Sequence, residues 1–223
     1  MGSASKPKIG AVLLAAGAGR RLGGVAKALI RIEGVSLAQR QLEALRDAGV
    51  DATVMVTGFA RQAVEAGARA LASRGPATTL AYNADYVQGL AGSVRIGLAA
   101  LGPGFDGIIM ALVDQPLIEA SDLSALIAAF GSRPGGHALV PHVNGARGNP
   151  VMLDEFVRSR VLASAPGSGV RDLLDREPSL VHLWQTDNVR FVTDLDSRAD
   201  LERVASLTGW RIELPPQGEA TPA

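Results

Sequence analysis

A glycine-rich segment with several cations lies close to the amino terminus. It runs from Leu13 to Lys27 and reads LLAAGAGRRLGGVAK. Glycine adopts backbone conformations that other residues avoid, so such a segment can curl closely around a bound anion. Its arginines and lysine would add positive charge. The composition predicts a site for the phosphates of a nucleotide, although a solvated surface loop could have the same composition.

Two common phosphate-binding motifs do not fit this segment. A GxGxxG dinucleotide motif that begins at Gly17 and Gly19 would need a third glycine where the chain has Leu22. A Walker A motif needs a GK pair, and the sequence contains none. The segment is therefore predicted to be a different kind of phosphate loop.

The surrounding residues indicate an α/β fold that would position this loop. Residues 8–15 form a short apolar run, typical of a strand buried on both faces. Ser36 then opens a capping box, and apolar residues follow at helical spacing as far as Gly49. Further strands and helices alternate, which predicts a three-layer α/β/α, Rossmann-like architecture with a mostly parallel sheet. Ligands bind beyond the carboxyl ends of such strands, where both Gly17 and Asp114 are expected.

The apolar patterns also predict where each strand and helix begins and ends. Strands are expected at residues 8–15, 52–57, 78–82, 107–113, 138–141, 151–153, 180–184 and 189–193. Helices are expected after Ser36, at 60–73, at 93–101, after Ser121, at 155–163, at 170–176 and after Ser197. One domain would cover residues 8–210, between a flexible N-terminus at 1–7 and a disordered tail at 211–223.

Charge and composition exclude several classes of function. Lys plus Arg and Asp plus Glu each total 22, so the chain lacks the basic excess of a protein that wraps nucleic acid. The sequence has no cysteine, which excludes disulfides, thiolate nucleophiles and cysteine-containing zinc sites. No apolar run approaches the roughly 20 residues that span a bilayer, and the start has no signal-peptide core. We expect a cytoplasmic protein without nucleic-acid or membrane partners.

Motifs along most of the chain are similar to one known family. The glycine-rich loop resembles the signature of the MobA-like NTP transferases, which include the molybdenum cofactor guanylyltransferase and cytidylyltransferase. Later segments resemble further motifs of that family, in the same order. They are NADYVQGLAGS at 83–93, DQP at 114–116, RGNPV at 147–151, GVRDLL at 169–174 and DLDSRADL at 194–201. The resemblance implies a fold of the nucleotide-diphospho-sugar transferase type.

The resemblance also implies a reaction and a set of catalytic groups. An acceptor phosphate would join the α-phosphorus of a nucleoside triphosphate, and pyrophosphate would leave. Positioning and charge stabilisation are then the main tasks of the protein. The family's metal positions fall on Asp114 and Asp196, which would hold Mg²⁺, and Asp194 could share that role. Lys27 and Arg21 would hold the β- and γ-phosphates, so the expected catalytic set is Lys27, Arg21 and Asp114.

Asp114 and Asp196 also have purely structural explanations. Asp114 could start a turn before Pro116, and Asp196 could be a solvated residue ahead of the capping box of the last helix. Arg20 is left outside the catalytic set because it would point elsewhere in the loop. Arg95 is expected on the surface.

Two further groups complete the expected site. The nucleotide-binding group is Leu14, Ala15, Ala16, Gly17, Gly19, Gly23, Lys27, Asn83, Gly89, Leu90 and Ser93. A polar loop is expected to receive the acceptor phosphate, with an ordinary turn as the alternative. Its residues are Asn144, Arg147, Gly148 and Asn149.

The motifs also bear on the substrates. The spacing of RRLGGVAK follows the guanylyltransferase pattern but has Ala26 where that pattern has Asp, whereas LAAG and QGLAGS are closer to the cytidylyltransferase. We therefore expect CTP as the nucleotide and the molybdopterin cofactor as the acceptor. GTP or another NTP, or a sugar-phosphate-like acceptor, is the alternative. A non-catalytic carrier that passes the cofactor to a molybdenum hydroxylase is a further hypothesis, while no flavin or dinucleotide fingerprint supports redox activity.

Overall fold

The apolar runs of the chain form an eight-stranded central sheet in the computed structural model, which describes residues 6–69 and 78–215. The strands are β1 (Ile9–Leu14), β4 (Ala52–Thr57), β5 (Thr78–Tyr82), β6 (Gly107–Leu112), β7 (Ala138–Val143), β8 (Ala146–Arg147), β9 (Val151–Leu153) and β10 (Val181–Gln185). Their order is β10-β7-β9-β6-β1-β4-β5, with β8 paired to β7. β1 pairs in parallel with β4 and β6, whereas β9 runs antiparallel between β6 and β7. The sheet is thus mostly parallel, as predicted.

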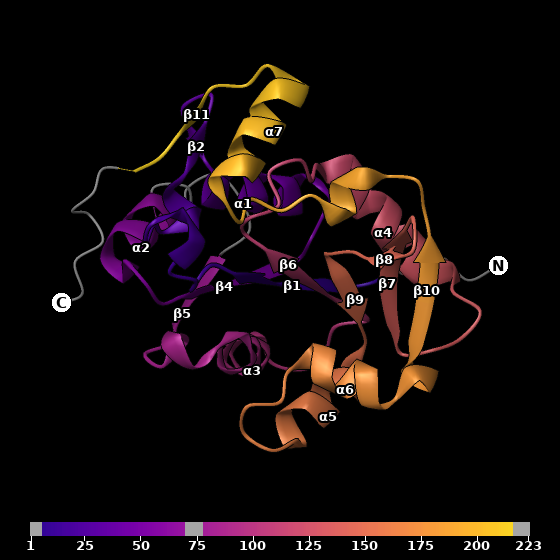
Figure 1. The fold of residues 1–223 in the computed structure, drawn as a ribbon. Helices are drawn as coiled ribbons and strands as arrows, with labels where there is room; N and C mark the ends of the chain where they lie inside the picture. Colours follow the sequence, from indigo (N-terminus) through magenta and orange to yellow (C-terminus); the bar gives the residue numbers. More distant parts are fainter. Residues whose placement is uncertain (1–5, 70–77, 216–223) are drawn as a thin grey trace.

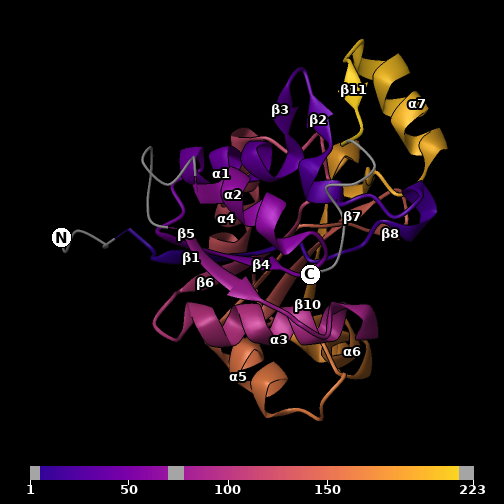
Figure 2. The ribbon, with the colours of Figure 1, turned by 90° about the vertical axis from the view of Figure 1, so that its left-hand side faces the viewer.

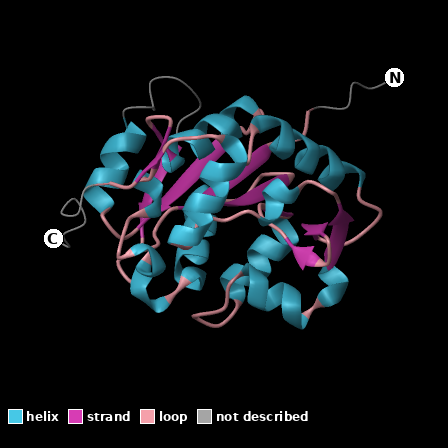
Figure 3. Cartoon of the chain, turned by 45° about the horizontal axis from the view of Figure 1, so that its top comes forward, coloured by secondary structure: helices cyan, strands magenta, loops and turns pink. Residues whose placement is uncertain are grey.

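Helices cover both faces of this sheet (Figures 1 and 2). One face carries α1 (Leu37–Asp47), α2 (Arg61–Arg69) and α4 (Ala120–Ser132), and the other carries α3 (Leu90–Leu101), α5 (Glu155–Ala163) and α6 (Val170–Arg176). Each face has its own buried apolar cluster. Leu13 belongs to the first and Val12 to the second, because successive side chains of a strand point to opposite faces. Figure 3 shows the strands enclosed by helices, which confirms the three-layer α/β/α architecture.

A smaller sheet and the last helix lie beside the first of these layers (Figure 1). The sheet contains β2 (Arg31–Ile32), β3 (Val35–Ser36) and β11 (Ile212–Glu213), in the order β11-β2-β3, and the helix is α7 (Arg198–Thr208). A two-residue turn with positive φ at Glu33 and Gly34 joins β2 to β3. Strands of two residues are too short for a hydrophobic period to predict them.

The ends of the chain differ from the expected domain limits. The tail predicted at 211–223 is wrong at its start, because Ile212–Glu213 pair with β2 and Leu214 packs against the core. Residues 216–223 and 1–5 lie outside the described residues. At the other end, the Lys6 ammonium donates to the Gly49 carbonyl. Within the described ranges, no helix combines the length and apolarity needed to cross a bilayer.

Two predicted helix starts are confirmed, and at each of them a serine caps the helix by accepting from an amide three residues later. The Ser36 hydroxyl accepts from the Gln39 amide at the start of α1, and Ser197 forms a capping box with Asp200 at the start of α7. Two other predicted starts are wrong, since α3 begins at Leu90 rather than residue 93, and Glu119 rather than Ser121 caps α4. The predicted helix 60–73 is described as far as Arg69, and the rest lies outside the described residues.

Short 3₁₀ helices connect the main elements, and one replaces a predicted strand. They are η1 (Arg20–Leu22), η2 (Lys27–Leu29), η4 (Tyr86–Gln88), η5 (Pro178–Leu180) and η6 (Val189–Val192). The strand predicted at 189–193 is wrong because η6 takes its place. Asn188 caps η6 by accepting from the Arg190 amide. The Arg190 guanidinium binds Glu119, the N-cap of α4, and Asp122 in the first turn of α4. These tertiary contacts hold the apolar segment in a turn.

Candidate active site

A cavity of about 300 Å³ opens at the carboxyl ends of β1 and β6. Its lining comes from the glycine-rich loop, the ends of both strands, the start of α3 and the segment before α7. The lining residues are Leu14, Ala16, Gly17, Gly19, Arg20, Arg21, Lys27, Leu90, Leu112, Val113, Asp114 and Asp196. Sequence reasoning left out Arg20, Leu112 and Val113, although the last two lie at the end of the same predicted strand as Asp114.

Gly19 gives the glycine-rich loop its shape. Its φ of 52° lies in the left-handed region, and its carbonyl accepts from the amides of Leu22 and Gly24 at 2.8 and 3.2 Å. A Cβ at this position would lie 2.1 Å from the Val25 carbonyl oxygen. Glycine is therefore required here by conformation and by space.

Gly19→Ala is expected to lower the free energy of unfolding by more than about 2 kcal/mol, because left-handed strain and a backbone clash add together. Gly17→Ala is the matched control, since a Cβ there meets no atom within 4 Å and its φ is not in the left-handed region. That variant should stay within about 0.5 kcal/mol of wild type. Urea unfolding of both proteins measures the difference, and equal stabilities would contradict this account of the loop.

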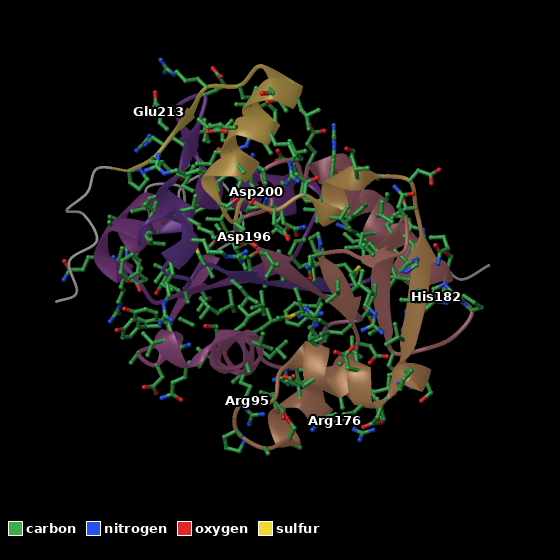
Figure 4. The ribbon with its side chains drawn as sticks, viewed as in Figure 1. Arg95, Arg176, His182, Asp196, Asp200 and Glu213 are labelled. Atoms are coloured by element: carbon green, nitrogen blue, oxygen red, sulfur yellow. The ribbon has the colours of Figure 1, made fainter. Side chains whose placement is uncertain are left out.

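Lys27 joins the loop to two carboxylates from distant parts of the chain. Its ammonium donates to Asp114 Oδ2 at 2.6 Å and also to Asp196 Oδ1. The Arg21 guanidinium donates to Asp196 Oδ2 at 2.8 Å. Asp196, labelled in Figure 4, lies between α7 and the central sheet. All members of the expected catalytic and metal sets thus meet at the cavity, with Lys27 bound to carboxylates in the described conformation.

The charges in this cluster shift one another's pKa. Burial lowers the pKa of Lys27, but Asp114 and Asp196 raise it more, so its pKa lies above the usual value. Burial raises the pKa of Asp196, but Lys27 and Arg21 lower it more, so its pKa lies below the usual value. Burial, followed by repulsion from Asp114 and Asp196, raises the pKa of Asp194 to about 6. Asp194 is therefore the carboxylate that carries an unfavourable charge at neutral pH.

Asp194→Asn is expected to stabilise the ligand-free protein above about pH 7 and to have little effect near pH 4. A folded-state pKa of about 6 against an ordinary 3.8 means that the folded chain holds this proton more tightly. The free energy of unfolding therefore falls as pH rises between those values, and asparagine removes this penalty. The gain should be about 1–3 kcal/mol for a half-buried group. Urea unfolding at both pH values in metal-free buffer checks it, and a pH-independent difference would argue against the shifted pKa.

Two carboxylate oxygens at the site test whether a metal ion fits. Asp114 Oδ1 and Asp194 Oδ1 are buried and have no hydrogen-bond partner among the described residues. Buried oxygens without donors suit a hard cation, and Mg²⁺ commonly takes one or two carboxylates together with substrate phosphates. Within residues 6–69 and 78–215, no three His, Cys, Asp or Glu side chains form a metal site by themselves. The donors thus fit a cation that shares its ligands with a phosphate.

Several expected nucleotide-binding residues shape the site from behind the cavity. Asn83 and Ser93 are each 2% exposed, and the Asn83 amide donates to Ser93 Oγ at 2.8 Å. Their side chains therefore bind each other and tie the loop before Leu90 to α3. The other members outside the cavity lining, Ala15, Gly23 and Gly89, contribute backbone shape: the Ala15 amide donates to the Val56 carbonyl, and both glycines have positive φ.

The expected acceptor loop lies at the carboxyl end of β7 and outside the cavity lining. Asn144 and Gly145 form the two-residue turn of the β7–β8 hairpin, with positive φ at both positions, so the turn alternative accounts for Asn144. The Arg147 guanidinium binds Asp175 of α6. Gly148 is buried against Phe191, and the Asn149 amide donates to the Phe191 carbonyl at 2.8 Å.

Arg95, labelled in Figure 4, corrects the expectation of a surface residue. Its guanidinium is half-buried and donates to the carbonyls of Val161, Leu162 and Ser164 at the end of α5. A cation at this position satisfies the last carbonyls of a helix. Arg95 therefore holds α3 against α5.

Comparison with known proteins identifies the family. A family model described as the MobA-like NTP transferase domain matches residues 11–183, which include the glycine-rich loop, Asp114 and the β7–β8 hairpin. The chain belongs to the MobA-like NTP transferase family. This confirms the family and fold predicted from the motifs, and with them the general expectation of a nucleotidyltransferase.

Relatives in this family differ in their named activities. Nicotine blue oxidoreductase of Paenarthrobacter nicotinovorans is 31% identical over 92% of this chain and 100% of its own length. A protein named probable molybdenum cofactor guanylyltransferase, of Opitutus terrae, is 33% identical over 64% of this chain and 65% of its own. The similarity therefore defines the family and leaves the substrate open.

Solved structures share the fold. Rv0371c of Mycobacterium tuberculosis has a TM-score of 0.72 and 26% identity, covering 89% of this chain and 98% of its own. Another crystal structure of Rv0371c, a complex with manganese, has a TM-score of 0.68 and 24% identity over the same shares of the two chains. Molybdopterin-guanine dinucleotide biosynthesis protein A of Archaeoglobus fulgidus has a TM-score of 0.64 and 20% identity, covering 90% and 98% of the chains.

Proposed function

We propose that this chain transfers CMP from CTP to the terminal phosphate of a molybdopterin-type cofactor and releases pyrophosphate. The observation that carries the proposal is the meeting of the Gly19 loop, Lys27 and Asp114 at one cavity, where Asp114 has an oxygen without a hydrogen-bond partner among the described residues. Cations beside a glycine loop suit a triphosphate, and a carboxylate oxygen suits its metal. The named guanylyltransferase relative supports the class of acceptor.

Each charged group has a task in this reaction. Lys27 would exchange its bonds to Asp114 and Asp196 for the β- and γ-phosphates, and Arg21 would add charge beside the leaving pyrophosphate. Asp114 and Asp196, with Asp194 beside them, would hold Mg²⁺, which orients the triphosphate and offsets the charge that develops on it. Manganese in an Rv0371c crystal supports the choice of a divalent cation.

The proposal assigns the acceptor to the neighbouring loop. The β7–β8 hairpin with Arg147 would receive the acceptor phosphate at the same edge of the sheet, and the finished cofactor would pass to a molybdenum hydroxylase. A carrier without catalysis would not need the carboxylates at the cavity. Their presence favours the enzyme over the non-catalytic alternative.

The nucleotide is tested by a thermal-shift panel of CTP, GTP, UTP and ATP with Mg²⁺. A ligand at 100 times its Kd adds about 2.7 kcal/mol of stability, which corresponds to a rise in Tm of about 5–10 °C for a chain of this length. We expect CTP with Mg²⁺ to give the largest shift and CTP with EDTA a smaller one. A larger shift with GTP would reassign the base, and no shift with any nucleotide would contradict the nucleotide site.

The end-to-end similarity to nicotine blue oxidoreductase favours a second candidate, an oxidoreductase acting on nicotine blue or a related compound. The two candidates differ in products. Oxidation of NADH or NADPH with nicotine blue, without pyrophosphate release from any NTP, would favour the oxidoreductase. Pyrophosphate release without NAD(P)H oxidation would favour the transferase.

A further inference from the structure

Gln115 is a buried amide beside the carboxylate Asp114. It has no exposed surface, and its side chain reaches two backbone carbonyls that are distant in sequence. Nε2 donates to the Asn149 carbonyl at 2.9 Å and to the Phe191 carbonyl at 3.2 Å. One amide group thus joins the end of β6 to two other segments.

Those two segments carry the remaining parts of the candidate site. Asn149 ends the acceptor loop 147–149, and Phe191 precedes the segment with Asp194 and Asp196. The segments also bind each other, since the Asn149 amide donates to the Phe191 carbonyl, and a Cβ at Gly148 would lie 2.7 Å from that oxygen. The Leu195 amide donates to the Asp114 carbonyl at 2.8 Å. The carboxylates proposed to hold the metal are Asp114, Asp194 and Asp196, and we call them the metal-side carboxylates. The segments that carry them and the acceptor loop 147–149 therefore meet around Gln115.

The main chain of Gln115 is held by a side chain of α1. Gln41 of α1 is also buried, and its Nε2 donates to the Gln115 carbonyl at 2.6 Å. The Gln115 side-chain Oε1 is buried without a partner among the described residues. An unpaired buried acceptor destabilises a fold relative to an apolar group of the same shape. The side chain therefore holds the two segments through its Nε2 donor alone.

We propose that Gln115 is a positioning residue that sets the distance between the metal-side carboxylates and the acceptor loop 147–149. It holds the backbone of Asn149 and Phe191, its amide also lies beside Asp194, and it does not line the cavity. The inference rests on the proposed function, which makes this loop the acceptor side. A displacement of about 1 Å in such a site can lower a rate about 10²-fold.

Gln115→Met tests the proposal, because methionine has a similar length and cannot donate. Gln41→Met is the matched control, since it removes a buried hydrogen bond to the same residue and leaves the Gln115 amide in place. In hydrogen exchange, the Asn149 and Leu195 amides should exchange at least about 10-fold faster in Gln115→Met and at the wild-type rate in Gln41→Met. With CTP and molybdenum cofactor, Gln115→Met should raise the KM for the cofactor at least about 10-fold and change the KM for CTP less than about 2-fold.

Unchanged exchange at Asn149 and Leu195 would overturn the proposal, and so would an equal rise of both KM values. If Gln115→Met does not fold, Gly148→Ala separates the acceptor loop from Phe191 and should give the same acceptor-specific rise in KM, whose absence would also overturn it. If the wild type transfers no nucleotide, the proposed function fails, and the exchange rates still decide whether Gln115 holds the loop.

Discussion

Asp114→Asn is expected to lower the rate of pyrophosphate release from CTP by about 10²–10³-fold while the protein stays folded. Asparagine keeps the shape of the side chain but removes its charge. The variant loses the negative charge that pairs with Lys27, and it weakens the proposed metal ligand, whose Oδ1 is buried without a hydrogen-bond partner among the described residues. A coupled pyrophosphate assay measures the rate, and circular dichroism with urea unfolding checks the fold.

Asp106→Asn is the matched control for this variant. Asp106 precedes β6 just as Asp114 follows it, so the two carboxylates lie at opposite ends of one strand. Asp106 is exposed and accepts from the Lys8 amide. We expect its variant to turn over CTP at close to the wild-type rate. Wild-type turnover in Asp114→Asn would remove this residue from the mechanism.

Lys27→Met is expected to weaken binding of CTP with Mg²⁺ and to slow transfer, lowering kcat/KM by about 10²-fold. The same variant should bind Mn²⁺ alone more tightly than wild type. In the wild type, the Lys27 ammonium binds Asp114 Oδ2 and Asp196 Oδ1, so a metal ion must displace the ammonium to bind these oxygens. Removing Lys27 therefore has opposite effects on nucleotide and on metal, which calorimetry with each ligand can separate.

Lys8→Met controls for the loss of one positive charge. Lys8 lies at the amino end of β1 with its ammonium over the Phe105 ring, at the opposite end of the strand from the glycine-rich loop. Its variant should bind CTP and Mn²⁺ as wild type does. Equal affinities of Lys27→Met and wild type for both ligands would return Lys27 to a structural role.

Much of the fold could be predicted from the sequence because its signals are local. β1 and β6 are apolar runs buried on both faces, and Ser36 and Ser197 cap their helices through residues three positions later. Features decided by distant contacts were missed. β11 forms by pairing with β2 across most of the chain, and η6 is held by Arg190 against α4.

In the candidate site, too, features with local sequence signals could be predicted, whereas features that depend on distant contacts could not. The rule that ligands bind at the carboxyl ends of parallel strands correctly placed the glycine-rich loop and Asp114 at one cavity. It could not show that Asn83 and Ser93 bind each other, because two polar residues ten positions apart give no signal of mutual pairing. Nor could it show that Gln115 reaches Asn149 and Phe191, since those carbonyls become neighbours through the folding of three segments.

Transfer of label from CTP labelled at the α-phosphorus tests the proposed reaction most directly. Wild-type protein, Mg²⁺ and molybdenum cofactor should give labelled cofactor and one pyrophosphate for each label transferred. Asp114→Asn should give almost none. Failure of the wild type to release pyrophosphate above the Asp114→Asn background, with CTP and with each other NTP, would contradict a nucleotidyl-transfer site at this cavity.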